Sequence, residues 1–296
     1  MGRFLSAVKS PNKTIKILKK RYLALGIDST LRELEKISTE HKLQEGPQGS
    51  KVSIILLTFN NLRYSKSCIY SILDFSNYSN LELVIIDNGS SDETPEFLKN
   101  LDKDYGNVRV ILNKNNRGFA GACNQGIKKA TGEYFIFLNN DTIVTPNWIE
   151  RLVQPLKDKK IGLVGPITNF MWNHQEIDIF YRSLDTMLKK SSQVTGQNKG
   201  KTRVARDVAF FCVAARSDVI KEVGDLDERF GMGMFEDDDY CLRVQKAGYK
   251  IVVVEDVFVH HFGQISLFSL GRGKYNELLE ENREKFEKKW GKGQND

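Results

Sequence analysis

Apolar runs alternate with helix-like stretches through the middle of the chain. The runs are short and almost continuous, and between them apolar residues recur at helical spacing. Strands this apolar are buried on both faces of a parallel sheet that helices cover. The pattern therefore predicts an α/β fold with a Rossmann-like, mostly parallel central sheet flanked by helices. The predicted strands are KVSIILL (51–57), LELVIID (81–87), VRVIL (108–112) and EYFIFL (133–138).

Polar residues follow these predicted strands. Thr58 comes after the first, Asp87 ends the second, and Asn139-Asn140-Asp141 follows the fourth. In open parallel sheets, ligands bind beyond the carboxyl ends of the strands. We therefore expect a ligand site at this edge of the sheet.

The pattern is lost between residues 167 and 206. SSQVTGQNKGKTR (191–203) shows no apolar face, and long unpatterned loops inside domains are often functional. We interpret this stretch as a lid over the site. Beyond it we expect structure over 208–215, a helix near 219–223, strands through 249–259 and a C-terminal helix from Tyr275 to Trp290, with Tyr275, Leu278, Leu279, Phe286 and Trp290 on one face.

The N-terminal 50 residues differ from the rest in charge. Residues 1–27 carry seven cations and no acid, whereas the whole chain has a net charge of +6, so the remainder is close to neutral. An apolar stripe at helical spacing accompanies these cations, and GPQGS (46–50) is typical of a linker. A basic amphipathic helix can lie on an anionic membrane or pack on its own domain, and the sequence leaves both open. A nucleic-acid-binding domain would spread its cations over the fold, so we expect no nucleic-acid partner.

Composition is that of an ordinary globular protein, with 40% hydrophobic and 28% charged residues among 296. No run is long enough to cross a membrane, and no signal peptide opens the chain. The cysteines are spread apart in apolar stretches without a CxxC pair, which predicts reduced thiols, no zinc and a cytoplasmic protein, with peripheral contact to the inner face of the cell membrane if the basic arm binds lipid. They are Cys68, Cys123, Cys212 and Cys241.

Acidic residues are concentrated in FEDDDYCLR (235–243), directly ahead of a helix-like run. A helix N-terminus favours anions, so this segment alone predicts only an acid-rich helix start. LNND (138–141), IIDNGSSD (85–92) and HH (260–261) provide further carboxylates, amides and imidazoles. Together these groups suit a metal ion, a sugar nucleotide and a general base.

The order of these motifs resembles the family 2 glycosyltransferases, which are inverting enzymes of GT-A fold. The resemblance runs through SIILLTFN, LVIIDNGSSDET, NRGFAGACNQGIKKATGEYFIFLNNDT and VGDLDERFGMGMFEDDDYCLRVQKAGY. It covers about residues 51–265 but neither the first 50 residues nor the 167–206 stretch. It implies a nucleotide-sugar donor, a divalent metal ion and inversion at the anomeric carbon.

Carried over by motif, the resemblance assigns donor-binding roles. Asp87 would bind the base of the nucleotide, and Thr58 and Gly118, the latter in NRGFAGACNQG, would also lie at the donor. LNND matches the family's metal motif with Asn139 in place of its first acid, which puts the strength of metal binding in doubt. Asn140 would lie near the ribose, and Asp141 would bind Mn²⁺ or Mg²⁺.

The late motifs supply the remaining roles. Asp237 would be the general base, with Glu236 orienting the acceptor hydroxyls and Asp239 supporting the helix start. Either His260 or His261 would be a further metal ligand, and since neighbouring side chains on a strand point oppositely, we expect only one to reach the metal.

The sequence thus predicts an N-terminal extension (1–50), a GT-A catalytic domain (51–265) and a C-terminal helix (266–296). The donor is expected to be a UDP-sugar ahead of a dTDP- or GDP-sugar, and the acceptor a glycan, lipid-linked or protein hydroxyl in polysaccharide biosynthesis. A rhamnosyltransferase-like bacterial enzyme is one such case. The alternatives are a catalytically inactive carbohydrate-binding or scaffold protein, and a sugar-phosphate nucleotidyltransferase; the latter needs a glycine-rich phosphate loop, which TFNNLRYS after the first strand lacks.

Overall fold

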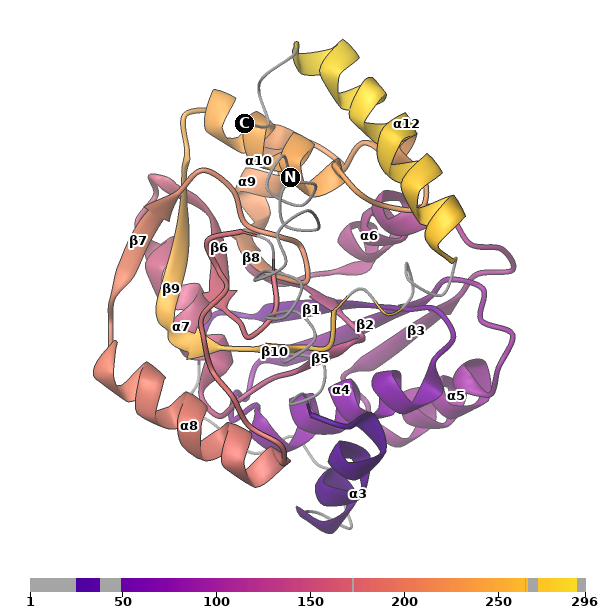
Figure 1. Cartoon of the computed structure of the whole chain (residues 1–296), viewed down its shortest axis with the longest axis vertical. Helices are drawn as coiled ribbons and strands as arrows, with labels where there is room; N and C mark the ends of the chain where they lie inside the picture. Colours follow the sequence, from indigo (N-terminus) through magenta and orange to yellow (C-terminus); the bar gives the residue numbers. More distant parts are fainter. Residues whose placement is uncertain (1–24, 38–48, 172, 264, 266–270, 292–296) are drawn as a thin grey trace.

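An eight-stranded sheet runs through the middle of the molecule (Figure 1). The computed structural model describes residues 25–37, 49–171, 173–263, 265 and 271–291. The strand order is β3-β2-β1-β4-β8-β6-β9-β7. Strands β3, β2, β1 and β4 are parallel, as predicted, and β8 is antiparallel to both β4 and β6. In chain order the strands are β1 (Val52–Thr58), β2 (Leu81–Asp87), β3 (Val108–Leu112), β4 (Tyr134–Asn139), β5 (Thr142–Ile143), β6 (Ile161–Ile167), β7 (Thr202–Ala205), β8 (Cys212–Arg216), β9 (Lys250–Phe258) and β10 (His260–His261).

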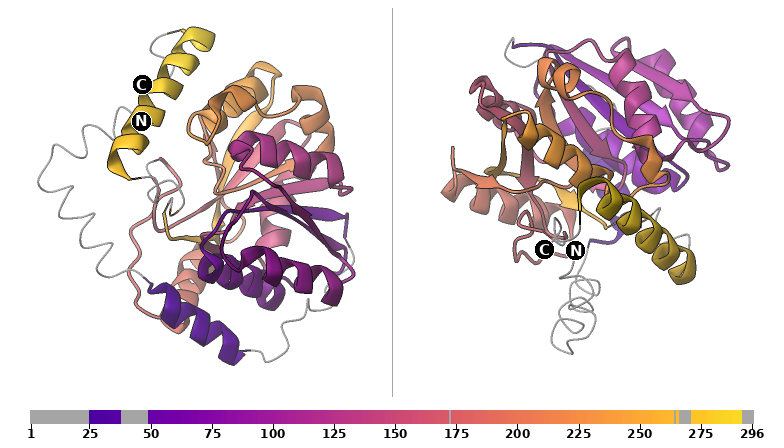
Figure 2. Two further views of the ribbon diagram at one scale, coloured as in Figure 1. Left: turned by 90° about the vertical axis from the view of Figure 1, so that its right-hand side faces the viewer. Right: turned by 90° about the horizontal axis from the view of Figure 1, so that it is seen from above.

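Helices cover both faces of this sheet (Figures 1 and 2). They are α3 (Ile27–Ile37), α4 (Leu62–Phe75), α5 (Thr94–Asp104), α6 (Gly118–Lys129), α7 (Trp148–Val153), α8 (Leu184–Gln197), α9 (Ser217–Val223), α10 (Glu236–Lys246) and α12 (Arg272–Trp290), with 3₁₀ turns η1 (Gln154–Lys157) and η2 (Glu228–Phe230).

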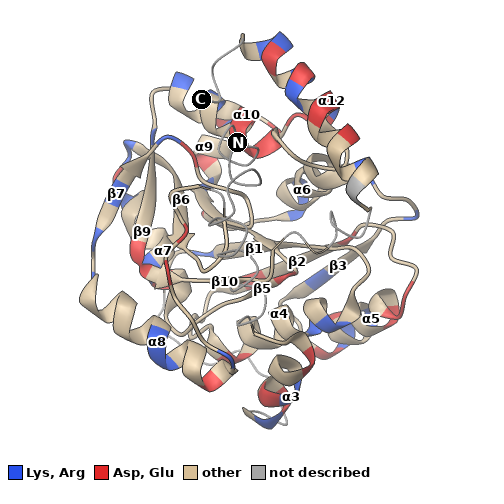
Figure 3. Ribbon diagram, viewed as in Figure 1, with Lys and Arg blue, Asp and Glu red and all other residues tan. Residues whose placement is uncertain are grey.

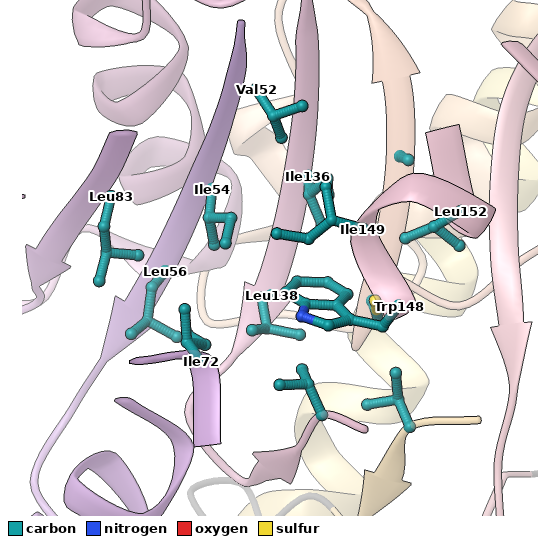
Figure 4. Packing of buried hydrophobic residues seen from close by; sticks show 14 of the residues in the cluster. Val52, Ile54, Leu56, Ile72, Leu83, Ile136, Leu138, Trp148, Ile149 and Leu152 are labelled. Atoms are coloured by element: carbon teal, nitrogen blue, oxygen red, sulfur yellow. The ribbon is translucent and has the colours of Figure 1, made fainter. Parts of the chain in front are cut away.

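Strand β1 shows how the sequence produces the two layers. All of its residues are buried, and they alternate between two hydrophobic clusters. Ile54 and Leu56 pack with residues of α4, α5 and α7, while Ile55 and Leu57 pack with residues of α6, α8 and α10. Figure 4 shows the first layer, in which Trp148 lies against Leu138 and Ile149. Each fully buried aliphatic side chain of this kind contributes about 1.5–3 kcal/mol of hydrophobic free energy.

The 191–203 stretch is not a loop, and its interpretation as a lid is wrong. Residues 184–197 form α8, which packs along β9, and Thr202–Ala205 form β7, which pairs antiparallel with β9 at the edge of the sheet. The buried face of α8 includes Ser191 and Thr195 beside Leu184 and Met187. Small polar residues occupy half of that face, so hydrophobicity alone conceals the helix.

The C-terminal helix is confirmed, with the predicted side facing inward. Tyr275, Leu279 and Phe286 of α12 are buried in a third hydrophobic cluster with Phe230, Met234 and Phe235 of the chain before α10. Charged residues of both signs cover the rest of α12, which runs beside the acidic start of α10 (Figure 3). The helix therefore packs against the segment that carries the predicted base.

Part of the N-terminal region also packs on the domain. Helix α3 contacts α4, its Leu34 side chain is fully buried, and Asp28 pairs with Arg63 at 2.6 Å. Residues 1–24, which include every cation of the basic arm, lie outside the described residues, and so does most of the predicted linker. All four cysteines are free and buried, as predicted. No helix among the described residues is long and apolar enough to span a membrane.

Candidate active site

A cleft opens at the carboxyl ends of β1 and β4. It encloses about 1010 Å³ of empty space, with open solvent at its mouth included. Aromatic and methionine side chains make up much of its wall, and polar groups from separate segments face into it. The lining residues are Leu57, Thr58, Phe59, Asn88, Asn116, Phe119, Asn139, Asn140, Asp141, Met171, Ala209, Phe210, Phe211, Met232, Gly233, Met234, Glu236, Asp237 and His261.

Thr58 and Asp87 lie side by side because their strands pair in register. The Thr58 hydroxyl donates to Asp87 Oδ1 at 3.1 Å, and the Ser90 N–H donates to Oδ2 at 3.0 Å. Thr58 lines the cleft, whereas Asp87 is buried just behind it and is bonded within its own strand-to-helix turn. These local bonds leave Oδ2 with capacity for one further donor, so the carboxylate can still accept from a ligand in the cleft.

Asp141 and His261 lie next to each other in the wall of the cleft. Strands β5 and β10 pair antiparallel and bring His261 opposite Thr142, next to Asp141. The Asp141 Oδ1 atom lies 3.5 Å from His261 Nε2, and Oδ2 accepts from the Ile265 N–H at 3.2 Å. Burial alone would raise the pKa of Asp141, but its interactions with His261 and the Ile265 N–H outweigh burial and lower it. Asp141 is thus an anion at neutral pH.

The His261 ring is oriented for a ligand at Nε2. Its ring stacks on Phe211 at 4.9 Å, and Nδ1 lies 3.1 Å from the Phe170 carbonyl oxygen. A carbonyl only accepts, so Nδ1 carries a proton, and in the neutral form of the ring the lone pair is therefore on Nε2. The buried Nε2 atom has no hydrogen-bond partner. A lone pair in this position, beside a carboxylate, suits a divalent cation.

His260 is directed away from the cleft. Its Nδ1 lies 2.6 Å from the Tyr181 hydroxyl, and its ring packs edge-on against Phe262. Burial, with the neighbouring His261, lowers the pKa of His260 to about 3, so the ring is neutral. We expected only one of the two histidines to face the metal site. His261 lines the cleft, and the structure does not bring His260 to it.

Two protein ligands are fewer than a metal site usually has. Within the described ranges, no three His, Cys, Asp or Glu side chains are grouped so that they could hold a metal ion. Asn139, which replaces the expected first acid, and Asn140 also line the cleft, and the Asn140 side chain donates to the Ser65 hydroxyl at 2.9 Å. Asp141 and His261 fit a cation whose other ligands come from a bound substrate and water.

The acids at the start of α10 differ in their surroundings. Glu236 and Asp237 line the cleft, and Glu236 Oε2 is buried without a partner. Burial raises the pKa of Glu236 well above its usual range, with the charge of Asp237 adding to the shift, and burial raises the pKa of Asp237 to about 6. Asp239 is instead fully buried and accepts from Arg243 Nε at 3.0 Å and from Trp290 Nε1 at 2.7 Å. Asp239 therefore supports the helix start, whereas Asp237 is available for chemistry.

The chain before α10 has an unusual backbone. Met234 and Phe235 have positive φ angles of 77° and 72°, and Gly231 and Gly233 have φ of 61° and 136°. A non-glycine residue in the left-handed region costs roughly 1–2 kcal/mol. These turns place Met232, Gly233 and Met234 on the cleft wall and aim Glu236 and Asp237 into the same space.

Gly118 lies beneath this loop and not on the cleft wall. A Cβ atom there would come within 2.0 Å of the Gly231 carbonyl oxygen, and Gly118 has φ of 74°. The next residue, Phe119, donates its N–H to the same oxygen at 3.2 Å and lines the cleft. The structure thus gives Gly118 a close-packing role under the acidic loop in place of the predicted contact with the donor.

Asn88 and Asn116 also line the cleft, and no role was predicted for either of them. The Asn88 side chain donates to Asn116 Oδ1 at 2.8 Å and accepts from the Arg117 N–H at 2.9 Å. This joins the turn after β2 to the turn after β3. The signal available in the sequence is an asparagine shortly after each of two predicted strands.

The protein-family model for glycosyl transferase family 2 matches residues 53–224, more than half of the chain. The chain belongs to glycosyl transferase family 2. It is therefore a glycosyltransferase, as its sequence motifs predicted.

Relatives of this chain are also named glycosyltransferases. The chain is 28% identical over 232 residues to the glycosyltransferase AglE of Haloferax volcanii, covering 75% of this chain and 72% of AglE. It is 34% identical over 127 residues to the glycosyltransferase GlyG of Streptococcus pneumoniae, covering 43% of this chain and 41% of GlyG. The chain thus spans less than half of GlyG.

Solved structures share the fold at low identity. They include GalNAc-T7 with UDP, GalNAc and Mn²⁺ (TM-score 0.56, 19% identity, 72% of this chain and 43% of that one) and the mannosyltransferase PcManGT of Pyrobaculum calidifontis with GDP-Man and Mn²⁺ (TM-score 0.56, 16% identity, 83% and 67%). These likenesses show the predicted GT-A fold. The family match itself includes Thr58, Asp87 and Asp141 but ends before Asp237 and His261, which the fold brings to the same cleft.

Proposed function

We propose that this family 2 glycosyltransferase moves a sugar from a nucleoside diphosphate donor to a hydroxyl group of a glycan, lipid-linked or protein acceptor, with inversion at the anomeric carbon. The observation that carries the proposal is the convergence of Asp141, His261, Glu236 and Asp237 on one cleft. These side chains come from separate segments of the chain, and neither strand pairing nor core packing requires acids there.

The polar wall formed by the strand ends is the proposed donor side. Thr58, with Asp87 behind it, would contact the nucleotide base, and Asn140 would lie near the ribose. No lysine or arginine lines the cleft in the part of the chain that the structure describes. A diphosphate carries negative charge, so a divalent ion held by Asp141 and His261 would supply the positive charge that stabilises the leaving group. Mn²⁺ and Mg²⁺ both suit such oxygen-rich ligands.

Asp237 is the proposed general base. As the acceptor oxygen bonds to the anomeric carbon, Asp237 takes the hydroxyl proton, and the bond from that carbon to the diphosphate oxygen breaks. Attack from the face opposite the leaving group inverts the carbon. The raised pKa of Asp237, about 6, leaves it ionised at neutral pH yet a stronger base than an exposed aspartate. Burial also raises the pKa of Glu236 well above its usual range, which favours the protonated form, and a protonated Glu236 would donate a hydrogen bond to a sugar or acceptor hydroxyl.

A panel of nucleotide sugars tests this reaction. Purified protein is incubated with UDP-, dTDP- and GDP-sugars and Mn²⁺ in the presence of simple glycan acceptors, and release of nucleoside diphosphate is measured. We expect release with one nucleotide class, and loss of release in excess chelator. Tight donor binding without turnover of any donor would favour a carbohydrate-binding protein, and pyrophosphate release from nucleoside triphosphates would favour a nucleotidyltransferase.

Attachment of residues 1–27 to an anionic membrane stays a prediction. Each cation near an anionic leaflet would contribute on the order of 1 kcal/mol, in a salt-sensitive way. Co-sedimentation with anionic vesicles, comparing the full chain with one that starts at Lys51, tests it at low and high salt. If neither protein sediments with vesicles at low salt, the membrane role is excluded.

A further inference from the structure

Asn282 stands out on the buried face of α12. Its side chain is fully buried, and its Nδ2 group lies within hydrogen-bond distance of three backbone carbonyl oxygens. These belong to Phe230 at 2.7 Å, Gly233 at 2.8 Å and Met234 at 3.3 Å. One side-chain amide thus connects the C-terminal helix to three carbonyl groups of residues 230–234.

That loop leads directly into the acidic start of α10. Gly233 and Met234 line the cleft, and Glu236 and Asp237 follow at once. The positive φ angles of Gly233, Met234 and Phe235 turn the chain sharply, so several carbonyls of one short segment point toward α12. Buried carbonyls need a donor, and the Asn282 amide carries two N–H bonds that meet this need.

A second contact joins α12 to the same acidic segment. At the end of the helix, Trp290 Nε1 donates to Asp239 Oδ1 at 2.7 Å, and Lys289 Nζ lies 2.5 Å from the same oxygen. Asp239 lies two residues beyond Asp237 in the first turn of α10. The helix therefore contacts the chain on both sides of Asp237, through Asn282 before it and Trp290 after it.

Packing alone does not explain an asparagine at this position. Its neighbours on the inward face, Leu279 and Phe286, are apolar, and an apolar residue of similar size would fill the same space. What the amide adds is hydrogen bonds to the carbonyl oxygens of a segment in which the positive φ angles of Met234 and Phe235 cost free energy.

We propose that Asn282 is a positioning residue for sugar transfer, which fixes the 230–235 loop so that Asp237 meets the acceptor hydroxyl, with Trp290 as a second support. This inference rests on the proposed role of Asp237 as general base. It gives the C-terminal helix, which lies outside the family match, a part in the reaction.

Asn282→Leu removes the amide and keeps the branched outline of the side chain. We expect kcat to fall about tenfold or more while KM for the donor changes less than about twofold, because the donor side of the cleft is untouched. Amide hydrogen exchange should accelerate in residues 231–235 and stay unchanged in β1 and β2. Asn282→Gln, which keeps the N–H₂ group, should recover part of the lost kcat.

Leu101→Ala in α5 is the control for lost stability, because this buried leucine lies in another cluster, remote from the loop. It should lower the melting temperature with kcat retained. Unchanged kcat in Asn282→Leu, or an equal loss of kcat in Leu101→Ala, overturns the proposal. If Asn282→Leu does not fold, Trp290→Phe is measured in its place, and unchanged kcat with unchanged loop exchange again overturns it.

Asp237→Asn is measured in parallel so that the role of Asp237 and the role of Asn282 are tested separately. If Asp237→Asn keeps its turnover, the proposed base is wrong whatever Asn282 does. If Asp237→Asn is inactive while Asn282→Leu turns over normally, only the positioning role fails.

Discussion

The two ends of the central strands carry acidic side chains in opposite electrostatic states. At the amino ends, Glu82 accepts from the Ser53 hydroxyl, from the Thr131 N–H at 2.5 Å and from Lys51 Nζ at 2.9 Å. Although burial opposes its ionisation, these donors lower the pKa of Glu82 to about 2. At the carboxyl ends, Glu236 and Asp237 face a cleft, and burial raises the pKa of both.

This difference separates a structural acid from the two acids proposed to act in the cleft. Glu82 has a donor for each oxygen and links β1, β2 and the turn before β4, so its charge stabilises the fold. Glu236 has a buried oxygen without a partner, and Asp237 holds its charge in poorly solvated surroundings. Unsatisfied acids destabilise a fold, and they occur where a substrate supplies the missing partners.

The largest effect is expected at the carboxyl end. Asp237→Asn keeps the shape of the side chain but removes the proton acceptor, so kcat should fall by roughly two to four orders of magnitude. Binding of the nucleoside diphosphate, measured by calorimetry, should change little. Glu82→Gln is the matched control: its kcat per folded molecule should stay near that of the wild type. A mutant Asp237→Asn with most of its turnover intact would falsify the base assignment.

The next effect concerns stability at the amino end. The pKa of Glu82 is lower in the folded protein than its usual 4.5, so its contribution is fully present above pH 4.5 and is lost as the pH falls toward 2. Glu82→Gln should therefore lower the free energy of unfolding at pH 7 by about 2–3 kcal/mol. Urea unfolding at several pH values measures this. A loss of stability that persists unchanged at pH 3 would show that the charge is not its cause.

In the same assay, Asp237→Asn should change the free energy of unfolding in the opposite direction and stabilise the protein. Its folded pKa of about 6 lies above the usual 3.8, so the ionised side chain destabilises the fold above pH 6 and that cost disappears below pH 4. The variant should be more stable than the wild type by about 1–2 kcal/mol at pH 8 and equally stable at pH 4. If the variant is less stable than the wild type at pH 8, the ionised Asp237 side chain does not destabilise the fold, and the proposed difference from Glu82 is wrong.

The smallest effect is a pH dependence of turnover. Because the base must be ionised, kcat/KM for the acceptor should decline about tenfold per pH unit below pH 6 in the wild type. Rates are compared between pH 5 and 8 with saturating donor and Mn²⁺. If the rate stays constant down to pH 5, a group other than Asp237 accepts the hydroxyl proton.

Much of the fold and part of the site could be predicted from the sequence. The apolar strands predicted the parallel half of the sheet because both faces of such strands are buried. Asp141 and Asp237, which line the cleft, could be proposed as site residues because they belong to recognisable motifs. Helix α8 was missed because Ser191 and Thr195 fill part of its buried face. Small polar residues pack well in a helix interface but carry no hydrophobic signal.

Other features depend on tertiary contacts that no local pattern contains. Strand alternation shows that His260 and His261 point oppositely, but only the pairing of β10 with β5 shows which one faces Asp141. Asn282 lies in a highly charged helix, where an asparagine is usually exposed. Its three backbone partners are about 50 residues earlier in the chain, so its role could be seen only in the folded structure.

The central claim is that the cleft at the carboxyl ends binds a nucleoside diphosphate together with a divalent cation. Titration of Mn²⁺ followed by electron paramagnetic resonance tests it directly, with UDP, dTDP and GDP added in turn to the wild type and to Asp141→Ala. We predict weak Mn²⁺ binding alone, binding tightened about tenfold or more by one of the nucleotides, and loss of that gain in Asp141→Ala. Binding of the nucleotide that is equally tight in chelator, or in Asp141→Ala, would contradict the account.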